Sequence, residues 1–120
     1  MKRDLLTIKQ LTGEEILSFI NRGLEIKRAG RNPERPLAGY TLGLIFEKAS
    51  TRTRVSFESA MTRLGGHTLF LSSDASQLSR NEPFKDTARV LSRYVDVLAI
   101  RTFSQDMVEE MARWSEIPVM

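Results

Sequence analysis

The chain has 120 residues, 41% of them hydrophobic and 28% charged, a balance that favours a single globular domain over a disordered or fibrous chain. It has no cysteine, which excludes disulfides and a cysteine nucleophile, and one histidine, His67, from which we expect neither a serine–histidine catalytic arrangement nor a multi-histidine zinc site within these residues. The net charge of +3 suits small anionic substrates. Because the basic residues are scattered among acidic ones without an aromatic ladder, we expect no nucleic acid binding.

The first predicted element is a helix near the N-terminus. Thr12 and Glu15 have the T-x-x-E spacing of a capping box. Ile16, Ile20 and Leu24 then recur every four residues, the spacing of a buried helical stripe. No long apolar run or small-residue cleavage site follows the basic residues at the start, so we expect no signal peptide, no membrane span and a cytoplasmic location.

A strand and a helix are predicted next, after a loop over residues 31–39. Residues 40–46 form a nearly continuous apolar run, which is typical of a strand buried on both faces of a parallel sheet. A helix should begin at Ser50 or Thr51 and end before Gly65 and Gly66. We expect its inward residues to include Val55, Met61 and Leu64.

The second half of the chain repeats the alternation. Further strands are predicted over residues 67–71, 95–100 and 117–120, and residues 72–81 are polar. Pro83 suits the first turn of a helix, and Ser104 suits an N-cap. The apolar residues expected on these two helices are Ala88, Val90, Leu91 and Tyr94 on the first and Met107, Val108, Met111 and Trp114 on the second.

Strands that alternate with helices predict an α/β fold: a three-layer αβα domain, residues 1–120, with a central parallel sheet of about four strands. In such sheets ligands bind beyond the carboxyl ends of the strands. The chemistry is therefore expected in residues 48–54, 72–80 and 101–104.

Residues 50–54, Ser-Thr-Arg-Thr-Arg, follow a predicted buried strand directly. At the N-terminus of a helix the first N–H groups lack helical partners and the dipole is positive, so anions are favoured there. Hydroxyls add donors, and an arginine fork matches two phosphate oxygens at once. The alternative is an ordinary cap followed by a solvated basic turn. The Walker pattern is absent, so binding of a nucleoside triphosphate is not indicated.

Three blocks carry a family resemblance that covers essentially the whole chain. Residues 46–58, Phe-Glu-Lys-Ala-Ser-Thr-Arg-Thr-Arg-Val-Ser-Phe-Glu, resemble the phosphate-binding segment of aspartate and ornithine carbamoyltransferases. Residues 77–83 and 86–96 agree in order and spacing, and Ile100-Arg101-Thr102-Phe103 follows. The Phe-Glu-Lys, Asp-Thr-Ala-Arg-Val-Leu and Arg-Thr-Phe strings resemble the ornithine branch.

The resemblance implies roles for individual residues. Ser50, Thr51, Arg52 and Thr53 would hold the phosphate of carbamoyl phosphate, with Arg101 reaching the phosphate and the carbonyl oxygen. Arg52 and Arg101 would be the catalytic residues, acting electrostatically.

Other residues are given lesser or shared roles. Gln77 lies in a loop that, in the family, completes a neighbouring subunit's site, so a homotrimer is implied. Arg54 is expected to have a structural, salt-bridging role. Arg80 would be either an accessory anion contact or a solvated charge, and His67 is expected to be a packed or surface residue.

The implied reaction is attack of the L-ornithine amine on carbamoyl phosphate, giving L-citrulline and phosphate without a cofactor or metal, as in arginine biosynthesis. The amino-acid-binding domain and a further His-Pro-x-Gln segment are expected outside these 120 residues, so the chain alone is expected to be inactive. Two alternatives stay open. One is a domain that serves aspartate or another amine, and the other is a non-catalytic anion-binding or assembly module.

Overall fold

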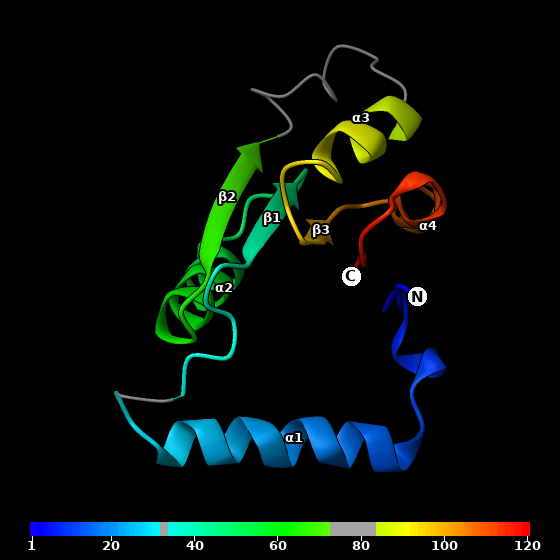
Figure 1. Ribbon diagram of the computed structural model, residues 1–120. Helices are drawn as coiled ribbons and strands as arrows, with labels where there is room; N and C mark the ends of the chain where they lie inside the picture. Colours follow the sequence, from blue (N-terminus) through cyan, green and yellow to red (C-terminus); the bar gives the residue numbers. More distant parts are fainter. Residues whose placement is uncertain (32–33, 73–83) are drawn as a thin grey trace.

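A computed structural model describes residues 1–31, 34–72 and 84–120. Within these residues a short 3₁₀ helix, η1, precedes four α-helices and three strands, which alternate along the chain after α1 (Figure 1). In chain order the elements are η1 (Ile8–Gln10), α1 (Gly13–Arg28), β1 (Thr41–Phe46), α2 (Thr51–Arg63), β2 (His67–Ser72), α3 (Phe84–Leu91), β3 (Val97–Arg101) and α4 (Gln105–Trp114). No helix in the described part of the chain is long and apolar enough to span a bilayer.

The three strands form a parallel sheet in the order β2-β1-β3, with β1 in the centre. Phe46, the last residue of β1, is paired with Ser72 on one side and Arg101 on the other. The carboxyl ends of all three strands therefore meet at one edge of the sheet, where ligands bind in folds of this class. The predicted fourth strand is reduced to a single parallel bridge between Leu98 and Val119.

Two hydrophobic cores, one on each face of the sheet, make the domain three-layered. Successive side chains of a strand point to opposite faces, so β1 supplies both cores. The core on the α2 side consists of Leu42, Leu44, Phe46, Met61 and Ala99. The core on the side of α3 and α4 consists of Ile45, Ala88, Val95, Leu98, Met107, Val108, Met111, Ala112 and Val119. Figure 1 shows the same division, and the expected αβα architecture is confirmed.

Gly43 permits close packing between β1 and β3. A Cβ atom at this position would lie 2.9 Å from a methyl group of Leu98 and 3.3 Å from one of Val95. Both neighbours are buried, so a side chain there would have to displace core atoms. The glycine in the middle of an otherwise large and apolar strand thus has a packing reason.

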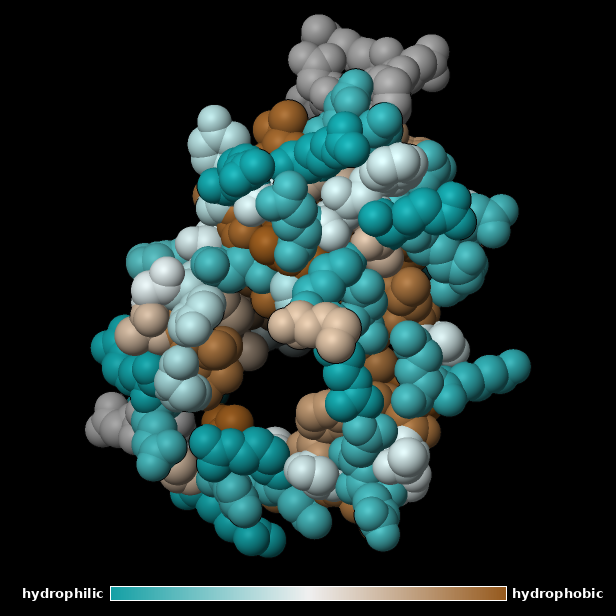
Figure 2. Space-filling view, turned by 45° about the vertical axis from the view of Figure 1, so that its right-hand side comes forward, coloured by the Kyte–Doolittle hydropathy of each residue, from teal (hydrophilic) through white to brown (hydrophobic). Residues whose placement is uncertain are grey.

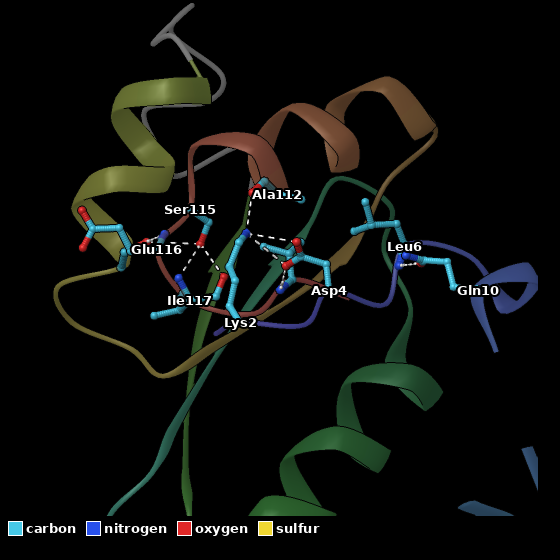
Figure 3. A network of polar contacts seen from close by, with 10 residues as sticks. Lys2, Asp4, Leu6, Gln10, Ala112, Ser115, Glu116 and Ile117 are labelled. Atoms are coloured by element: carbon cyan, nitrogen blue, oxygen red, sulfur yellow. Dashed lines mark hydrogen bonds and ion pairs between the residues drawn. The ribbon is translucent and has the colours of Figure 1, made fainter. Parts of the chain in front are cut away.

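The N-terminal segment is attached to the α4 side of the domain (Figure 3). The ammonium group of Lys2 donates to the carbonyl of Ala112 and forms a 3.1 Å ion pair with Asp4. Asp4 in turn accepts a hydrogen bond from the N–H of Val119 at 2.9 Å, and the N–H of Leu5 donates to the Val119 carbonyl at 2.8 Å. These contacts fix the point from which η1 and α1 leave the domain.

The expected buried stripe on α1 is not buried in this structure. Its capping box is confirmed, since Thr12 accepts from the N–H of Glu15 at 3.2 Å and Glu15 accepts from that of Thr12 at 2.9 Å. However, α1 contributes no buried residue, and Ile20 and Leu24 are 53% and 43% exposed. Figures 1 and 2 show the reason: α1 lies apart, and an open space separates it from the rest of the molecule.

Three smaller expectations are also corrected. Val55 on α2 is 52% exposed, because it lies on the face directed away from the sheet, whereas Met61 is buried as expected. Tyr94 is 73% exposed and follows the end of α3, and Val90 is 53% exposed. β3 begins two residues later than predicted, at Val97. Ser104 is confirmed as the N-cap of α4, accepting from the N–H of Met107 at 3.3 Å.

Candidate functional site

The N-terminus of α2 lies at the carboxyl edge of the sheet, directly after β1. Ser50 is its N-cap: its hydroxyl oxygen accepts a hydrogen bond from the N–H of Thr53 at 3.3 Å. The first helical hydrogen bond runs from the N–H of Arg54 to the carbonyl of Ser50, so the N–H groups of Thr51 and Arg52 precede the helical ladder. These amides and the positive end of the helix dipole favour an anion here.

Arg101 brings the end of β3 to the same helix terminus. Its Nη1 donates to the hydroxyl oxygen of Thr53 at 3.0 Å, and the hydroxyl of Ser50 donates to the same oxygen at 2.9 Å. With both lone pairs of Thr53 Oγ1 used, its own O–H is left to donate. Nε of Arg101 is buried, and none of the described residues accepts a hydrogen bond from it. A buried N–H without an acceptor costs about 1–3 kcal/mol, which an anion at this position would offset.

Two cavities flank the first turn of α2. One, of about 250 Å³, is lined at its polar end by Glu47, Ser50, Thr51 and Arg54. The other, of about 170 Å³, has Thr53 and Arg101 among its lining residues. The sequence prediction therefore placed the hydroxyls and Arg101 at one edge of the sheet, and the structure connects them through the hydroxyl group of Thr53.

Arg54 has the structural contacts expected of it. Its Nε forms a 3.3 Å ion pair with Glu58 one turn later, and its guanidinium group lies 3.5 Å from the centre of the Phe70 ring. These contacts tie α2 to β2, and they leave Arg54 on the wall of the larger cavity. The expected salt bridge is thus confirmed.

The remaining candidate residues are differently placed. Thr51 and Arg52 are exposed on the first turn of α2; Thr51 lines the larger of the two cavities, whereas Arg52 lines neither of them. Gln77 and Arg80 lie outside the described residues. His67 is exposed at the start of β2, the opposite end of the sheet from this site. The carboxylate of Asp96 accepts a hydrogen bond from the N–H of Thr41 at 2.8 Å, which connects the residue before β3 to the start of β1.

Glu47 and Thr102 are polar residues of the site that the sequence analysis did not single out. The hydroxyl of Thr102 donates to the carboxylate of Glu47, and the N–H of Glu47 donates to the carbonyl of Arg101 at 2.8 Å. Each is the first residue after a strand, Glu47 after β1 and Thr102 after β3. Their position at the carboxyl ends of neighbouring strands was the signal available in the sequence.

The arrangement is suited to binding a phosphate group and stabilising charge on it. It offers helix N–H groups, hydroxyl donors and a guanidinium group at one edge of a parallel sheet. Within the described ranges no group of three or more histidine, aspartate or glutamate side chains could hold a metal ion.

Comparison with known proteins agrees with this reading. Residues 3–120 match the family model described as "Aspartate/ornithine carbamoyltransferase, carbamoyl-P binding domain". The chain is 54% identical over 120 residues to the ornithine carbamoyltransferase of Halalkalibacterium halodurans, a match that covers 98% of this chain and 38% of the relative.

Solved structures are similar over the whole chain. The anabolic ornithine carbamoyltransferase of Campylobacter jejuni superposes with a TM-score of 0.91 at 48% identity, covering 100% of this chain and 38% of that one. The catalytic subunit of M. jannaschii aspartate transcarbamoylase gives 0.84 at 34% identity, covering 99% and 40%. The chain belongs to the aspartate/ornithine carbamoyltransferase family, in its carbamoyl-P binding domain, and it spans about two fifths of the length of these relatives.

Proposed function

We propose that these 120 residues are the carbamoyl phosphate-binding domain of an ornithine carbamoyltransferase. The observation that carries the proposal is the meeting of the α2 N-terminus with Arg101, through the hydroxyl of Thr53. The phosphate would be held by the first N–H groups of α2, the hydroxyls of Ser50, Thr51 and Thr53, and the guanidinium group of Arg52.

In the proposed reaction the amine nitrogen of L-ornithine attacks the carbonyl carbon of carbamoyl phosphate. A C–N bond forms, the C–O bond to the phosphate breaks, and the products are L-citrulline, phosphate and a proton. Charge grows on the carbonyl oxygen during attack and on the phosphate as it leaves. Arg101 and Arg52 would stabilise that charge electrostatically, and Arg101 is already held beside the α2 N-terminus by its hydrogen bond to Thr53.

Ornithine is the acceptor we favour, and aspartate is the second candidate. The 54% and 48% identical relatives are both named ornithine carbamoyltransferases, whereas the aspartate transcarbamoylase is 34% identical. The acceptor-binding residues belong, in our proposal, to a second domain outside these 120 residues. Citrulline formation by the 120-residue polypeptide alone would contradict the assignment of acceptor binding to a second domain.

Assembly, location and pathway complete the proposal. We place the enzyme in the cytoplasm, in arginine biosynthesis, as a homotrimer in which the segment around Gln77 reaches a neighbouring site. The support is the resemblance of the chain to ornithine carbamoyltransferases, one of which is described as anabolic. The subunit number is tested by sedimentation equilibrium, and a monomeric full-length enzyme would contradict the shared site.

Titration calorimetry with carbamoyl phosphate tests the binding site. Because hydrogen bonds to charged groups contribute about 1.5–3 kcal/mol, Arg52→Ala should weaken binding by about 10-fold to 150-fold. Arg63→Ala is the matched control, since Arg63 is exposed in the last turn of the same helix, away from the site. If Arg52→Ala and Arg63→Ala bind carbamoyl phosphate equally well, the site assignment is wrong.

A further inference from the structure

The site is formed by two segments that are distant in the sequence, and they must be held in a fixed position relative to each other. The hydroxyls belong to the segment after β1, and Arg101 ends β3. A backbone hydrogen bond, from the N–H of Glu47 to the carbonyl of Arg101 at 2.8 Å, continues the pairing of these strands one residue beyond β1. The backbone of Arg101 is therefore fixed from the β1 side.

The hydroxyl of Thr102 makes side-chain hydrogen bonds in which the donor and the acceptor can be assigned. Its oxygen accepts a hydrogen bond from the N–H of Ser104 at 3.1 Å, so its own proton is directed elsewhere and is donated to the carboxylate of Glu47. Ser104 is also the N-cap of α4. Since α4 packs into the core through residues such as Met107, which is 2% exposed, the connection ends on a rigid element.

Arg101 lies between the backbone hydrogen bond from Glu47 and the side-chain hydrogen bonds of Thr102. Its backbone is held by Glu47, the residue after it is held by the Glu47 carboxylate, and its Nη1 must reach Thr53 at 3.0 Å. The guanidinium group is partly buried and Nε has no acceptor among the described residues, so its direction depends on the Nη1 bond to Thr53 and on the position of the backbone that carries it. A misplacement of about 1 Å at such a group can reduce activity by about 100-fold.

We propose that Glu47 and Thr102 are positioning residues, which act through Arg101 to aim its guanidinium group at the bound carbamoyl phosphate. The inference rests on the proposed function, because it takes carbamoyl phosphate as the ligand of Arg101. Glu47 does not bind the substrate: its carboxylate is negative and would repel a phosphate dianion. The carboxylate instead accepts a charge-assisted hydrogen bond from the hydroxyl of Thr102.

A double-mutant cycle separates positioning from a merely structural role. Thr102→Val keeps the shape of the side chain and removes the hydroxyl, whereas Thr102→Ser keeps the hydroxyl. Carbamoyl phosphate affinity is measured by calorimetry for Thr102→Val, for Arg101→Ala and for the two combined. Thr62→Val is the matched control, because Thr62 is exposed near the far end of α2.

We expect Thr102→Val to weaken binding by about 5-fold to 10-fold, less than the loss of a hydrogen bond made to the phosphate itself, because its effect reaches the ligand only through Arg101; Thr102→Ser should bind like the parent. In the Arg101→Ala background Thr102→Val should change affinity by less than about 2-fold, because its effect passes through Arg101. Thr102→Ala also removes the hydroxyl and leaves the charge of Glu47 unchanged, so it should behave in the cycle as Thr102→Val does, and it replaces that variant if Thr102→Val does not fold, as judged by circular dichroism.

The outcomes distinguish the inference from the proposed function. If the parent does not bind carbamoyl phosphate, both are overturned. If the parent binds and Arg101→Ala weakens binding, the proposed function stands. The inference alone is then overturned by a Thr102→Val or Thr102→Ala variant that binds like the parent, or by an equal loss with and without Arg101.

Discussion

The helices α1 and α2 begin in similar ways and end in different surroundings. Each has a hydroxyl N-cap, Thr12 on α1 and Ser50 on α2, which accepts a hydrogen bond from the N–H three residues later. Yet α1 contributes no buried residue, whereas α2 covers a hydrophobic core and carries the candidate site at its N-terminus. An N-cap determines the residue at which a helix begins. The elements packed around the helix determine whether its N-terminus lies at a binding site.

The difference lies in what precedes each cap. Before Ser50 the chain runs through β1, the central strand. The N-cap of α2 therefore lies at the edge of the sheet at which β3 ends with Arg101. Before Thr12 the chain runs through η1, none of whose residues is buried. The same local chemistry therefore gives an anion-binding candidate in one place and an isolated helix end in the other.

The largest expected effect tests the difference in packing. Leu44→Ala, beneath α2 and 0% exposed, should lower the free energy of unfolding by about 2–5 kcal/mol, because it leaves a cavity in the core. Leu24→Ala on α1, where the side chain is 43% exposed, should change it by no more than about 0.5 kcal/mol. Urea unfolding of both variants gives the measurement. Equal losses would show that α1 is packed in solution.

The two caps provide a smaller and more selective test. Ser50→Ala and Thr12→Ala should each destabilise their own helix by about 1 kcal/mol, seen as roughly 5-fold faster amide exchange in that helix. Only Ser50→Ala should also weaken carbamoyl phosphate binding in calorimetry, since its hydroxyl belongs to the site. Weaker binding by Thr12→Ala would contradict the separation of the two helices.

The smallest effect concerns pH and distinguishes the caps chemically. The pKa of Glu15 is lowered from its usual value of 4.5, chiefly by the hydrogen bond from the backbone N–H of Thr12 and then by the side chain of Arg3. A lowered pKa in the folded state means that the stabilisation is fully present above pH 4.5 and is lost as the pH falls through the lower folded value.

The first turn of α2 has no acidic residue, and Thr53 stands where α1 has Glu15, so no carboxylate titrates there. Acidification from pH 6 to pH 3 should therefore speed amide exchange in the first turn of α1 more than in that of α2, measured relative to the intrinsic rates. Glu15→Gln should remove the difference, because the amide can still accept from the Thr12 N–H without titrating. An unchanged α1 in the parent would refute the assignment.

Much of the fold followed from local patterns. The capping box at Thr12, the N-cap at Ser104 and the apolar run over residues 40–46 each predicted an element that the structure confirms. These signals depend on neighbours within a few residues, so they can be recognised before the fold is known.

Predictions of burial were less successful, because burial depends on partners elsewhere in the chain. Ile20 and Leu24 have helical spacing, but no other described element covers their face. Val55 is apolar, yet it lies on the outer face of α2.

The sequence by itself determined the elements, their alternation and the likeness of residues 50–54 to a phosphate-binding turn, because all of these depend on short-range spacing. The family resemblance had already indicated Arg101 as a partner of that turn, and only the tertiary structure showed by which contacts distant residues join it. Arg101 meets Thr53 across 48 positions of the chain, and Thr102 meets Glu47 across 55, because β1 and β3 are neighbours in the sheet. The physical reason is that parallel pairing brings the ends of separate strands together, and no local pattern records which strands will pair.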